Sequence, residues 1–185
     1  RGVQAKGDFG RDGVYMPEYY YDKDNGRKVT KAGFVKDNRG LTYYLDEKGN
    51  KVLGLHEING DLYYFRRGGA YKYTQLGDMW QDSINYIDGK IYYFGHDGRA
   101  IKNRFYQWGN YWYYFYADGS AATGAVQING QQLYFDKNHG RQVKGAFAPD
   151  GHYYDENSGE LVTNQTRTIK GVTYHFDENG NATKV

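Results

Sequence analysis

Short aromatic or aliphatic runs alternate with polar turns along nearly the whole chain. In the stretch QLYFDKNHGRQVKG, residues 132–145, an apolar run meets a polar turn, and a short segment ending in Gly145 follows. Asn-Gly or Asp-Gly pairs precede several of these runs and supply the positive φ of tight hairpin turns. The aromatic runs favour strands. Because helical periodicity is absent, the pattern predicts β-hairpins and almost no helix.

The hairpin pattern repeats about every twenty residues. Residues 58–65, 87–94, 128–135 and 169–176 match one another, and degenerate copies end at positions 21, 45, 115 and 154. We call the last residue of each aromatic run its anchor; the anchors are Tyr21, Leu45, Phe65, Phe94, Phe115, Phe135, Tyr154 and Phe176. Such a period is typical of solenoids. We therefore predict an all-β fold, a β-solenoid of stacked β-hairpin repeats, with about eight units in residues 19–185 and the irregular end of a preceding repeat in residues 1–18.

Strand alternation sorts the aromatic side chains into two faces. The second and fourth positions of each run share one face and are predicted to form the core: Tyr63 and Phe65, Tyr92 and Phe94, Tyr113 and Phe115, Leu133 and Phe135. The third position is predicted to point to an outer, amphipathic face: Tyr20, Tyr44, Tyr64, Tyr93, Tyr114, Tyr134, Tyr153 and His175. The long interval after Phe65 contains an insert at residues 70–86, which is consistent with an extra hairpin in which Trp80 packs.

Composition excludes several classes of protein. The 185 residues include 22 Tyr and 26 Gly but few aliphatic residues, which favours a thin, elongated body over a sphere. With no cysteine, neither a disulfide framework nor a thiolate metal site can form. The net charge is +2, and acidic and basic residues are scattered along the chain. The clustered Lys and Arg residues that are typical of nucleic-acid-binding proteins are therefore absent. The sequence has no run that could cross a bilayer and no signal peptide, and it begins at Arg1, as expected of a piece of a longer protein.

The sequence contains no recognisable metal-binding or catalytic motif. The five histidines occupy unrelated repeat positions, without metal-ligand spacing. Residues 22–26, DKDNG, resemble the start of a calcium loop but lack its downstream Glu, so they are interpreted as turn formers. The many carboxylates lie in turns, where no apolar pocket could raise one pKa for acid–base work. We therefore predict no metal, no cofactor and no catalytic residue.

Aromatic residues interleaved with Gln, Asn, Lys and Asp are the residue types that a carbohydrate-binding site requires. The C–H face of a pyranose stacks on a ring, while its hydroxyls need donors and acceptors at the rim. Identical weak sites in a row would raise avidity for a polymer by about 10²–10⁴. The candidates are the third-position tyrosines, the pair Gln142 and Lys144, and the cluster of Trp108 and Trp112 beside Tyr111 and Tyr113. Each group also has a structural alternative. The tyrosines could only build the walls of the solenoid, the pair Gln142 and Lys144 could be a solvent-exposed strand edge, and part of the Trp108 and Trp112 cluster could belong to the core.

Two stretches carry a family resemblance. INGQQLYFDKNHGRQVKG at 128–145 and IDGKIYYFGHDGRAIK at 87–102 resemble the cell-wall-binding, or YG, repeats, and above all the C-terminal glucan-binding domains of glucansucrases. The resemblance extends over residues 19–185. Choline-binding modules and clostridial toxin repeats share part of the pattern. A choline cage needs a Gly-Trp pair in each repeat, and none of the three tryptophans here follows Gly.

The resemblance implies pockets between consecutive units, each with a stacking Tyr, a Gln-x-Lys pair and a Thr or backbone group. Gln142 and Lys144 match the pair, Tyr134 matches the Tyr of that unit, and Tyr153 matches that of the next. Further candidates are Thr123 and Lys102, which fall where Lys144 falls in its unit, together with Tyr114 and Trp108. Ala100 replaces the Gln before Lys102, and the corresponding pairs in the first two units are Lys28 with Thr30 and Lys51 with Leu53.

The expected function is a non-catalytic module that binds α-glucan, such as dextran or isomaltooligosaccharides, for a secreted glucansucrase. The module is expected to be monomeric, attached to a catalytic domain of the parent and associated with the bacterial cell surface, with no nucleic-acid partner and no membrane insertion. Two alternatives stay open at this point. One is a module that attaches to the cell wall or to host glycan, and the other is a structural spacer.

Overall fold

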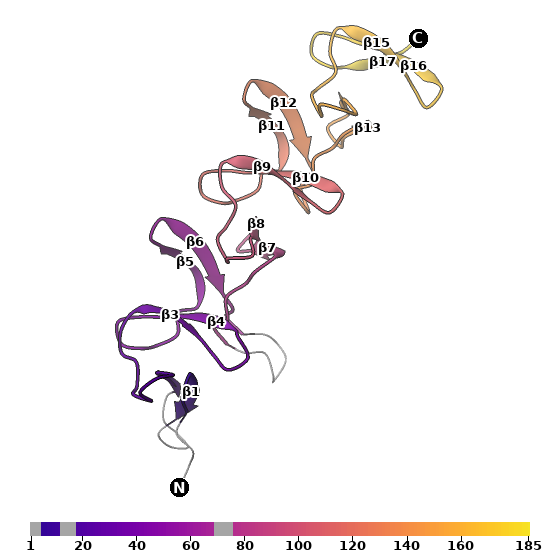
Figure 1. The fold of residues 1–185 in the computed structure, drawn as a ribbon. Helices are drawn as coiled ribbons and strands as arrows, with labels where there is room; N and C mark the ends of the chain where they lie inside the picture. Colours follow the sequence, from indigo (N-terminus) through magenta and orange to yellow (C-terminus); the bar gives the residue numbers. More distant parts are fainter. Residues whose placement is uncertain (1–4, 12–17, 69–75) are drawn as a thin grey trace. The chain divides into compact units, whose positions relative to one another are not determined.

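The computed structural model describes residues 5–11, 18–68 and 76–185 (Figure 1). Every regular element in these ranges is a β-strand. None of the described residues belongs to a helix long and apolar enough to cross a membrane. The strands are β1 Asp8–Arg11, β2 Glu18–Tyr21, β3 Gly33–Lys36, β4 Thr42–Leu45, β5 Gly54–Ile58, β6 Asp61–Phe65, β7 Ser83–Ile87, β8 Lys90–Phe94, β9 Arg104–Trp108, β10 Tyr111–Phe115, β11 Gly124–Ile128, β12 Gln131–Phe135, β13 Ala146–Phe147, β14 Tyr153–Tyr154, β15 Gln165–Ile169, β16 Val172–Phe176 and β17 Ala182–Lys184.

Successive strands pair as antiparallel hairpins. The described strands form the pairs β1–β2, β3–β4, β5–β6, β7–β8, β9–β10, β11–β12 and β13–β14, and the three-stranded sheet β15–β16–β17. The second strand of every hairpin ends at a predicted anchor, so the strand ends are confirmed. The tight turns are confirmed as well: Asn129 and Gly130 have φ of 52° and 79°. Two consecutive positive values are the signature of the turn whose twist matches paired strands.

A short third segment completes each repeat. After its turn, the chain forms a single antiparallel bridge back to the anchor in the first seven repeats, as in Phe135 with Gln142 and Phe65 with Met79, whereas in the last repeat β17 pairs with β16. We call the residue opposite the anchor the bridge residue. The next residue donates its N–H to the carbonyl of the third-position residue, as Val143 does to Tyr134 at 2.8 Å. The sequence unit of about twenty residues is therefore one hairpin plus one bridging segment.

The bridge residue also joins its repeat to the preceding one. Its N–H donates to a carbonyl three positions before the preceding anchor, and the donor–acceptor pairs are Met79 to Thr42, Ala100 to Leu62, Ala121 to Ile91, Gln142 to Trp112 and Leu161 to Gln132, at 2.7–2.8 Å. Because a two-stranded hairpin leaves backbone groups unpaired at its edges, this bond satisfies groups that would otherwise need water. The same bond fixes how each hairpin stacks on the one before it.

The repeats form two compact units, each of which is a stack of hairpins. The first unit contains residues 1–84 and 93–100, and the second contains residues 85–92 and 101–185. Of the bonds just described, those from Met79 and Ala100 lie within the first unit, and those from Ala121, Gln142 and Leu161 lie within the second. The predicted all-β solenoid of stacked hairpins is therefore confirmed.

The core differs from the predicted one in its breadth. The anchors are buried as expected, with Phe65, Phe94, Phe115, Phe135 and Phe176 at 0% exposure. The third-position side chains, predicted to face outward, are largely buried too: Tyr20, Tyr64, Tyr93, Tyr134 and Tyr153 are buried, Tyr44 and Tyr114 are half-buried, and His175 is exposed. The prediction of an open outer face was wrong because the bridging segment and the next repeat cover that face. Tyr134, for example, packs against Val143 of its own repeat and Tyr154 of the next.

Two further expectations need correction. Residues 1–18 were interpreted as the irregular end of a preceding repeat, yet Asp8–Arg11 pairs with Glu18–Tyr21 and belongs to the first hairpin. The first part of the insert at 70–86, residues 70–75, lies outside the described residues. Its later part forms no extra hairpin but supplies the bridging segment of its repeat, where Met79 bonds to Thr42 and Trp80 to Tyr64. Trp80 packs on the ring of Tyr64, with 4.3 Å between centroids.

Aspartates directly after an anchor cap the second turn. The carboxylate of Asp155 accepts hydrogen bonds from the amides of Asn157 and Ser158, and it pairs with Arg167 at 2.8 Å. The hydrogen bond from the Ser158 amide and that from Arg167 hold the pKa of Asp155 well below its ordinary value. Asp22 caps its turn in the same way, which supports its interpretation as a turn former.

We predict that Asp155→Asn flattens the acid dependence of stability. A carboxylate with a lowered folded-state pKa stabilises the fold above its unfolded pKa of about 3.9, and this contribution is lost as the pH falls below that value. The difference in unfolding free energy between the parent and Asp155→Asn should therefore be full at pH 6 and shrink below about pH 4. Urea unfolding at several pH values measures it. Glu156→Gln, an exposed neighbour, is the control, and a difference that stays constant down to pH 2 would contradict the assignment.

Candidate functional site

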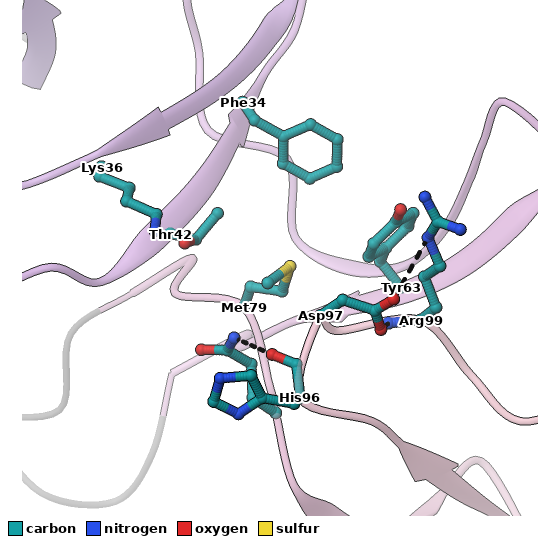
Figure 2. A pocket seen from close by; sticks show the side chains of 9 residues that line it. Phe34, Lys36, Thr42, Tyr63, Met79, His96, Asp97 and Arg99 are labelled. Carbon is teal, nitrogen blue, oxygen red and sulfur yellow. Dashed lines mark hydrogen bonds and ion pairs between the residues drawn. The ribbon is translucent and has the colours of Figure 1, made fainter.

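A cavity of about 350 Å³ lies among three consecutive repeats of the first unit (Figure 2). We call it the Phe34 site, and its lining consists of Phe34, Lys36, Thr42, Tyr63, Met79, Gln81, His96, Asp97 and Arg99. Its apolar wall comes from Phe34, Tyr63 and Met79, and polar and charged side chains form the rest. Aromatic rings beside several donors and acceptors are the surroundings that a polar ligand with an apolar face requires.

The repeat pattern places each wall of the Phe34 site. Phe34 lies opposite Tyr44 in the β3–β4 hairpin. The ring of Phe34 meets the ring of Tyr63, from the next repeat, edge-on at 5.3 Å between centroids. Met79 is the bridge residue of that next repeat, and Gln81 follows it by two positions. Since 45% of Phe34 remains exposed, the aromatic wall is open to solvent.

Charged groups lie at the rim of this cavity. Nδ1 of His96 lies 2.8 Å from the carboxylate of Asp82, and this hydrogen bond raises the pKa of His96 above its usual value. The guanidinium of Arg99 approaches the carboxylate of Asp97 at 3.5 Å. The side-chain amide of Gln81 donates to the backbone carbonyl of His96, which ties the bridging segment to the turn of the following repeat.

The predicted pair Gln142 and Lys144 occupies the same repeat positions in the second unit. Gln142 is a bridge residue, as Met79 is, and Lys144 follows it by two positions, as Gln81 follows Met79. The Nζ of Lys144 donates to the carbonyl of Asn157 at 3.2 Å, and it lies 5.7 Å from the ring centre of Trp112. We call the group Trp112, Gln142, Lys144, Asn157 and Gly159 the Gln142 site.

Gly159 allows the pair to lie against the turn of the next repeat. Its φ is 73°, and a Cβ there would collide with the amide of Gln142 and come within 3.1–3.3 Å of Gln142 Cδ and Lys144 Cγ. Both side chains therefore project to one side, as the alternation predicts, while Val143 packs on Tyr134 and Tyr154. Trp112 is 37% exposed. In the Gln142 site it is the aromatic residue beside Lys144, where the family resemblance implies a stacking tyrosine.

The other predicted residues are dispersed over the repeats. Tyr134 and Tyr153 are buried, and Tyr114 is half-buried against Phe105 at 4.9 Å between centroids. Trp108 is exposed at the end of β9, opposite Tyr111 rather than in the Gln142 site. Thr123 is exposed and Lys102 is half-buried, each two positions after the bridge residue of its repeat. The structure thus brings Gln142 and Lys144 together with Trp112, and it leaves the other candidates in separate repeats or in the core.

A second cavity, of about 360 Å³, contains Tyr153. Its lining is Gly145, Ala146, Phe147, Tyr153, Ile169, Lys170, Val172 and Tyr174. Phe147 lies opposite Tyr153 in its hairpin and meets Tyr174 edge-on at 5.2 Å between centroids, which repeats the arrangement of Phe34 with Tyr44 and Tyr63. Phe34 and Phe147 were missed as candidates. Counting back across the hairpin turn from each third-position residue to its cross-strand partner would have found both.

Metal ligation has no support in the described parts of the chain. No group of three or more His, Cys, Asp or Glu residues there is placed to hold an ion. The chemistry that the Phe34 and Gln142 sites offer is instead stacking on an aromatic ring together with hydrogen bonding from amide, ammonium and guanidinium groups.

Comparison with known proteins places the chain among repeat proteins. Family models match at residues 122–165, as a choline-binding repeat, and at residues 32–51, 103–121 and 167–182, as a putative cell wall binding repeat. Solved structures of proteins from Streptococcus pneumoniae have a similar fold. CbpJ gives a TM-score of 0.74 at 26% identity over 95% of this chain and 57% of its own, and choline binding protein F gives 0.72 at 25% over the same shares.

Curated relatives are glucosyltransferases. Glucosyltransferase-S of Streptococcus mutans is 37% identical over 98% of this chain, and glucosyltransferase-I of Streptococcus downei is 38% identical over 85%. The chain spans only about a tenth of the length of these relatives, 12% and 10% respectively. The chain therefore carries choline-binding and putative cell wall binding repeats and is homologous to a segment of the streptococcal glucosyltransferases.

Proposed function

We propose that the chain is a non-catalytic domain that binds α-glucan, such as dextran or isomaltooligosaccharides, and that serves a sucrose-dependent glucosyltransferase. The observation that carries the proposal is the Gln142 site. There the partly exposed indole of Trp112, the amide of Gln142 and the ammonium group of Lys144 lie close together between two repeats. Homology to glucosyltransferases over most of the chain supports the choice of an α-glucan as the ligand.

Each group of the Gln142 site has a role toward a glucose ring. The exposed face of Trp112 takes the apolar C–H face of the sugar. The amide of Gln142 both donates to and accepts from hydroxyls, and the ammonium of Lys144 donates to them. Because Lys144 already bonds to the carbonyl of Asn157, its position is fixed before the ligand arrives, which lowers the entropy lost on binding.

The Phe34 site serves as a further place for the same polymer. It offers the rings of Phe34 and Tyr63 with the polar groups of Gln81, Asp97 and Arg99 around them. Sites of this kind are shallow, so each binds weakly. A glucan chain that reaches two of them gains about 10²–10⁴ in avidity over either one.

The setting of the domain is part of the proposal. Cell-wall-binding repeats and glucosyltransferase relatives suit a secreted or cell-surface protein of a bacterium. The domain would act as a monomer, joined to the catalytic part of its parent, and would hold the growing polymer near that part. It would neither bind nucleic acid nor insert into a membrane.

A second candidate is a module that attaches to the cell wall or to host glycan. The match of residues 122–165 to a choline-binding repeat favours it, as does the fold shared with choline binding proteins. The two candidates differ in the ligand that competes: an isomaltooligosaccharide releases the first kind of module from its polymer, and choline releases the second kind from its wall.

Gln142→Ala and Lys144→Ala should each weaken binding to dextran. One lost hydrogen bond corresponds to about 0.5–1.5 kcal/mol, or roughly a two- to tenfold rise in the dissociation constant. Affinity electrophoresis in gels with and without dextran measures the retardation. Lys137→Ala, on an exposed turn of the same repeat, is the matched control.

The outcomes of the gel separate site from function. If dextran retards both variants as strongly as the parent, the Gln142 site is not where the glucan binds, although the α-glucan-binding function still holds. No retardation of the parent by dextran would remove the α-glucan proposal, and elution by choline would replace it with the second candidate.

Gly159→Ala should weaken dextran binding more than Gly171→Ala. Both glycines have positive φ, so either change strains the backbone by about 1–2 kcal/mol. At Gly159 the added methyl also displaces Gln142, whereas at Gly171 it meets open space. Dextran retardation and urea unfolding, measured on both variants, separate the two effects. Equal loss of retardation in both variants would show that the turn matters only for stability.

A further inference from the structure

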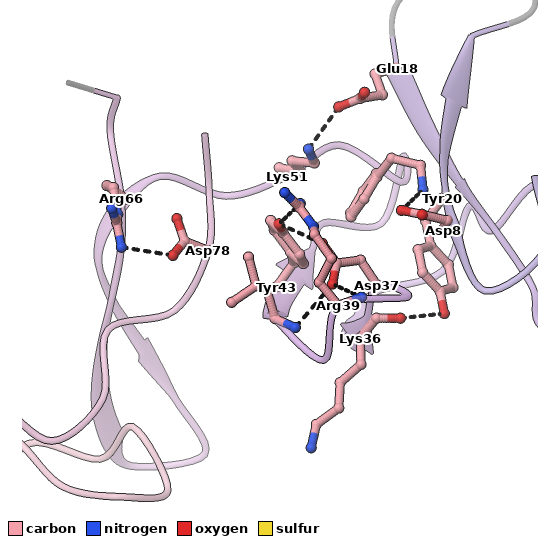
Figure 3. Close-up of polar contacts among 12 residues, drawn as sticks. Asp8, Glu18, Tyr20, Lys36, Asp37, Arg39, Tyr43, Lys51, Arg66 and Asp78 are labelled. Atoms are coloured by element: carbon pink, nitrogen blue, oxygen red, sulfur yellow. Dashed lines mark hydrogen bonds and ion pairs between the residues drawn. The ribbon is translucent and has the colours of Figure 1, made fainter. Parts of the chain in front are cut away.

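Lys51 lies with its ammonium group over aromatic rings in the first unit. Its Nζ is 3.7 Å from the ring centre of Phe9 and 4.9 Å from that of Tyr43, and it pairs with the carboxylate of Glu18 at 2.7 Å (Figure 3). The Lys51 side chain is only 11% exposed. We call Phe9, Glu18, Tyr43 and Lys51 the Phe9 site.

The Phe9 site has the same repeat positions as the open Phe34 site. Phe9 lies opposite a third-position residue, Tyr20, as Phe34 lies opposite Tyr44. Phe9 meets Tyr43 of the next repeat at 4.7 Å between centroids and 70°, as Phe34 meets Tyr63 at 5.3 Å and 61°. Lys51 is the bridge residue of its repeat, as Met79 is of the next one. One position of the repeat is thus an open cavity in one copy and holds the protein's own ammonium group in another.

We propose that Lys51 is an internal ligand that closes the Phe9 site, and that this site is built to hold an alkylammonium group. The rings of Phe9 and Tyr43 attract a cation through their negative faces. The carboxylate of Glu18 supplies the counter-charge, and the low exposure of the lysine limits screening by solvent. Glu18 lies three positions before its anchor, where the Phe34 site has the uncharged Thr42.

The proposal makes the bridge residue the determinant of what each site accepts. With Lys51 in place, its own ammonium group occupies the space over Phe9 and Tyr43 that an external cation would take. Truncating the side chain to its Cβ removes three carbons and the ammonium, which together have the shape of n-propylammonium. The vacated site should therefore bind this ion, whether or not the domain binds glucan elsewhere.

The test is an NMR titration of the whole chain carrying Lys51→Ala with n-propylammonium chloride. We expect saturable amide shifts at Phe9, Glu18 and Tyr43 at millimolar concentrations. The wild type and Lys48→Ala, an exposed lysine in the same repeat, should give no saturable shift at these residues. The uncharged isostere n-propanol should give none with Lys51→Ala.

Two results would overturn the proposal. One is equal response of Lys51→Ala to n-propylammonium and n-propanol, which would mean that only apolar space was opened. The other comes from the wild type, so it holds even if the variant fails to fold. The ε-methylene protons of Lys51 should be shifted upfield by the ring of Phe9, and Phe9→Leu should reduce the shift; ordinary lysine values in the wild type would contradict the internal ligand.

Discussion

The structure depends on one hydrogen bond that recurs between successive repeats, from the N–H of a bridge residue to a carbonyl of the preceding hairpin, as from Gln142 to Trp112 at 2.8 Å. An isolated hairpin is at best marginally stable and leaves its edges unpaired. This bond pairs an edge group and sets the stacking of one repeat on the next. It also brings side chains of three successive repeats around one position. The bridge residue lines that position, so Lys51, Met79 and Gln142 give it three different surroundings on one backbone arrangement.

Much of this plan is local and could be predicted from the sequence. The strand ends follow from aromatic runs, and the turns from Asn-Gly pairs such as Asn129-Gly130, because both depend on near neighbours in the chain. The common side of Gln142 and Lys144 follows from strand alternation alone. The capping hydrogen bonds of Asp22 and Asp155 also follow from the sequence, because an Asp at the start of a turn accepts hydrogen bonds from the amides of that turn.

The remaining features depend on stacking, which alternation within one strand does not reveal. The third-position Tyr134 is buried because its own bridging segment and the next repeat cover it. Trp112 joins Lys144 only through a contact between two consecutive repeats. The bridging role of Met79 could not be predicted because the insert before it hides the repeat spacing. Lys51 was recognised as a departure from the Gln-x-Lys pattern, but its place over Phe9 requires the stacked structure.

We propose that ligands bind where the bridge residue of one repeat meets its neighbours. The most direct test is a map of amide and indole shifts of the whole chain during titration with isomaltotriose. We expect saturable shifts concentrated at Trp112, Gln142, Lys144 and the turn at Gly159. Shifts confined to residues far from any bridge residue, such as the exposed Tyr86, would contradict it.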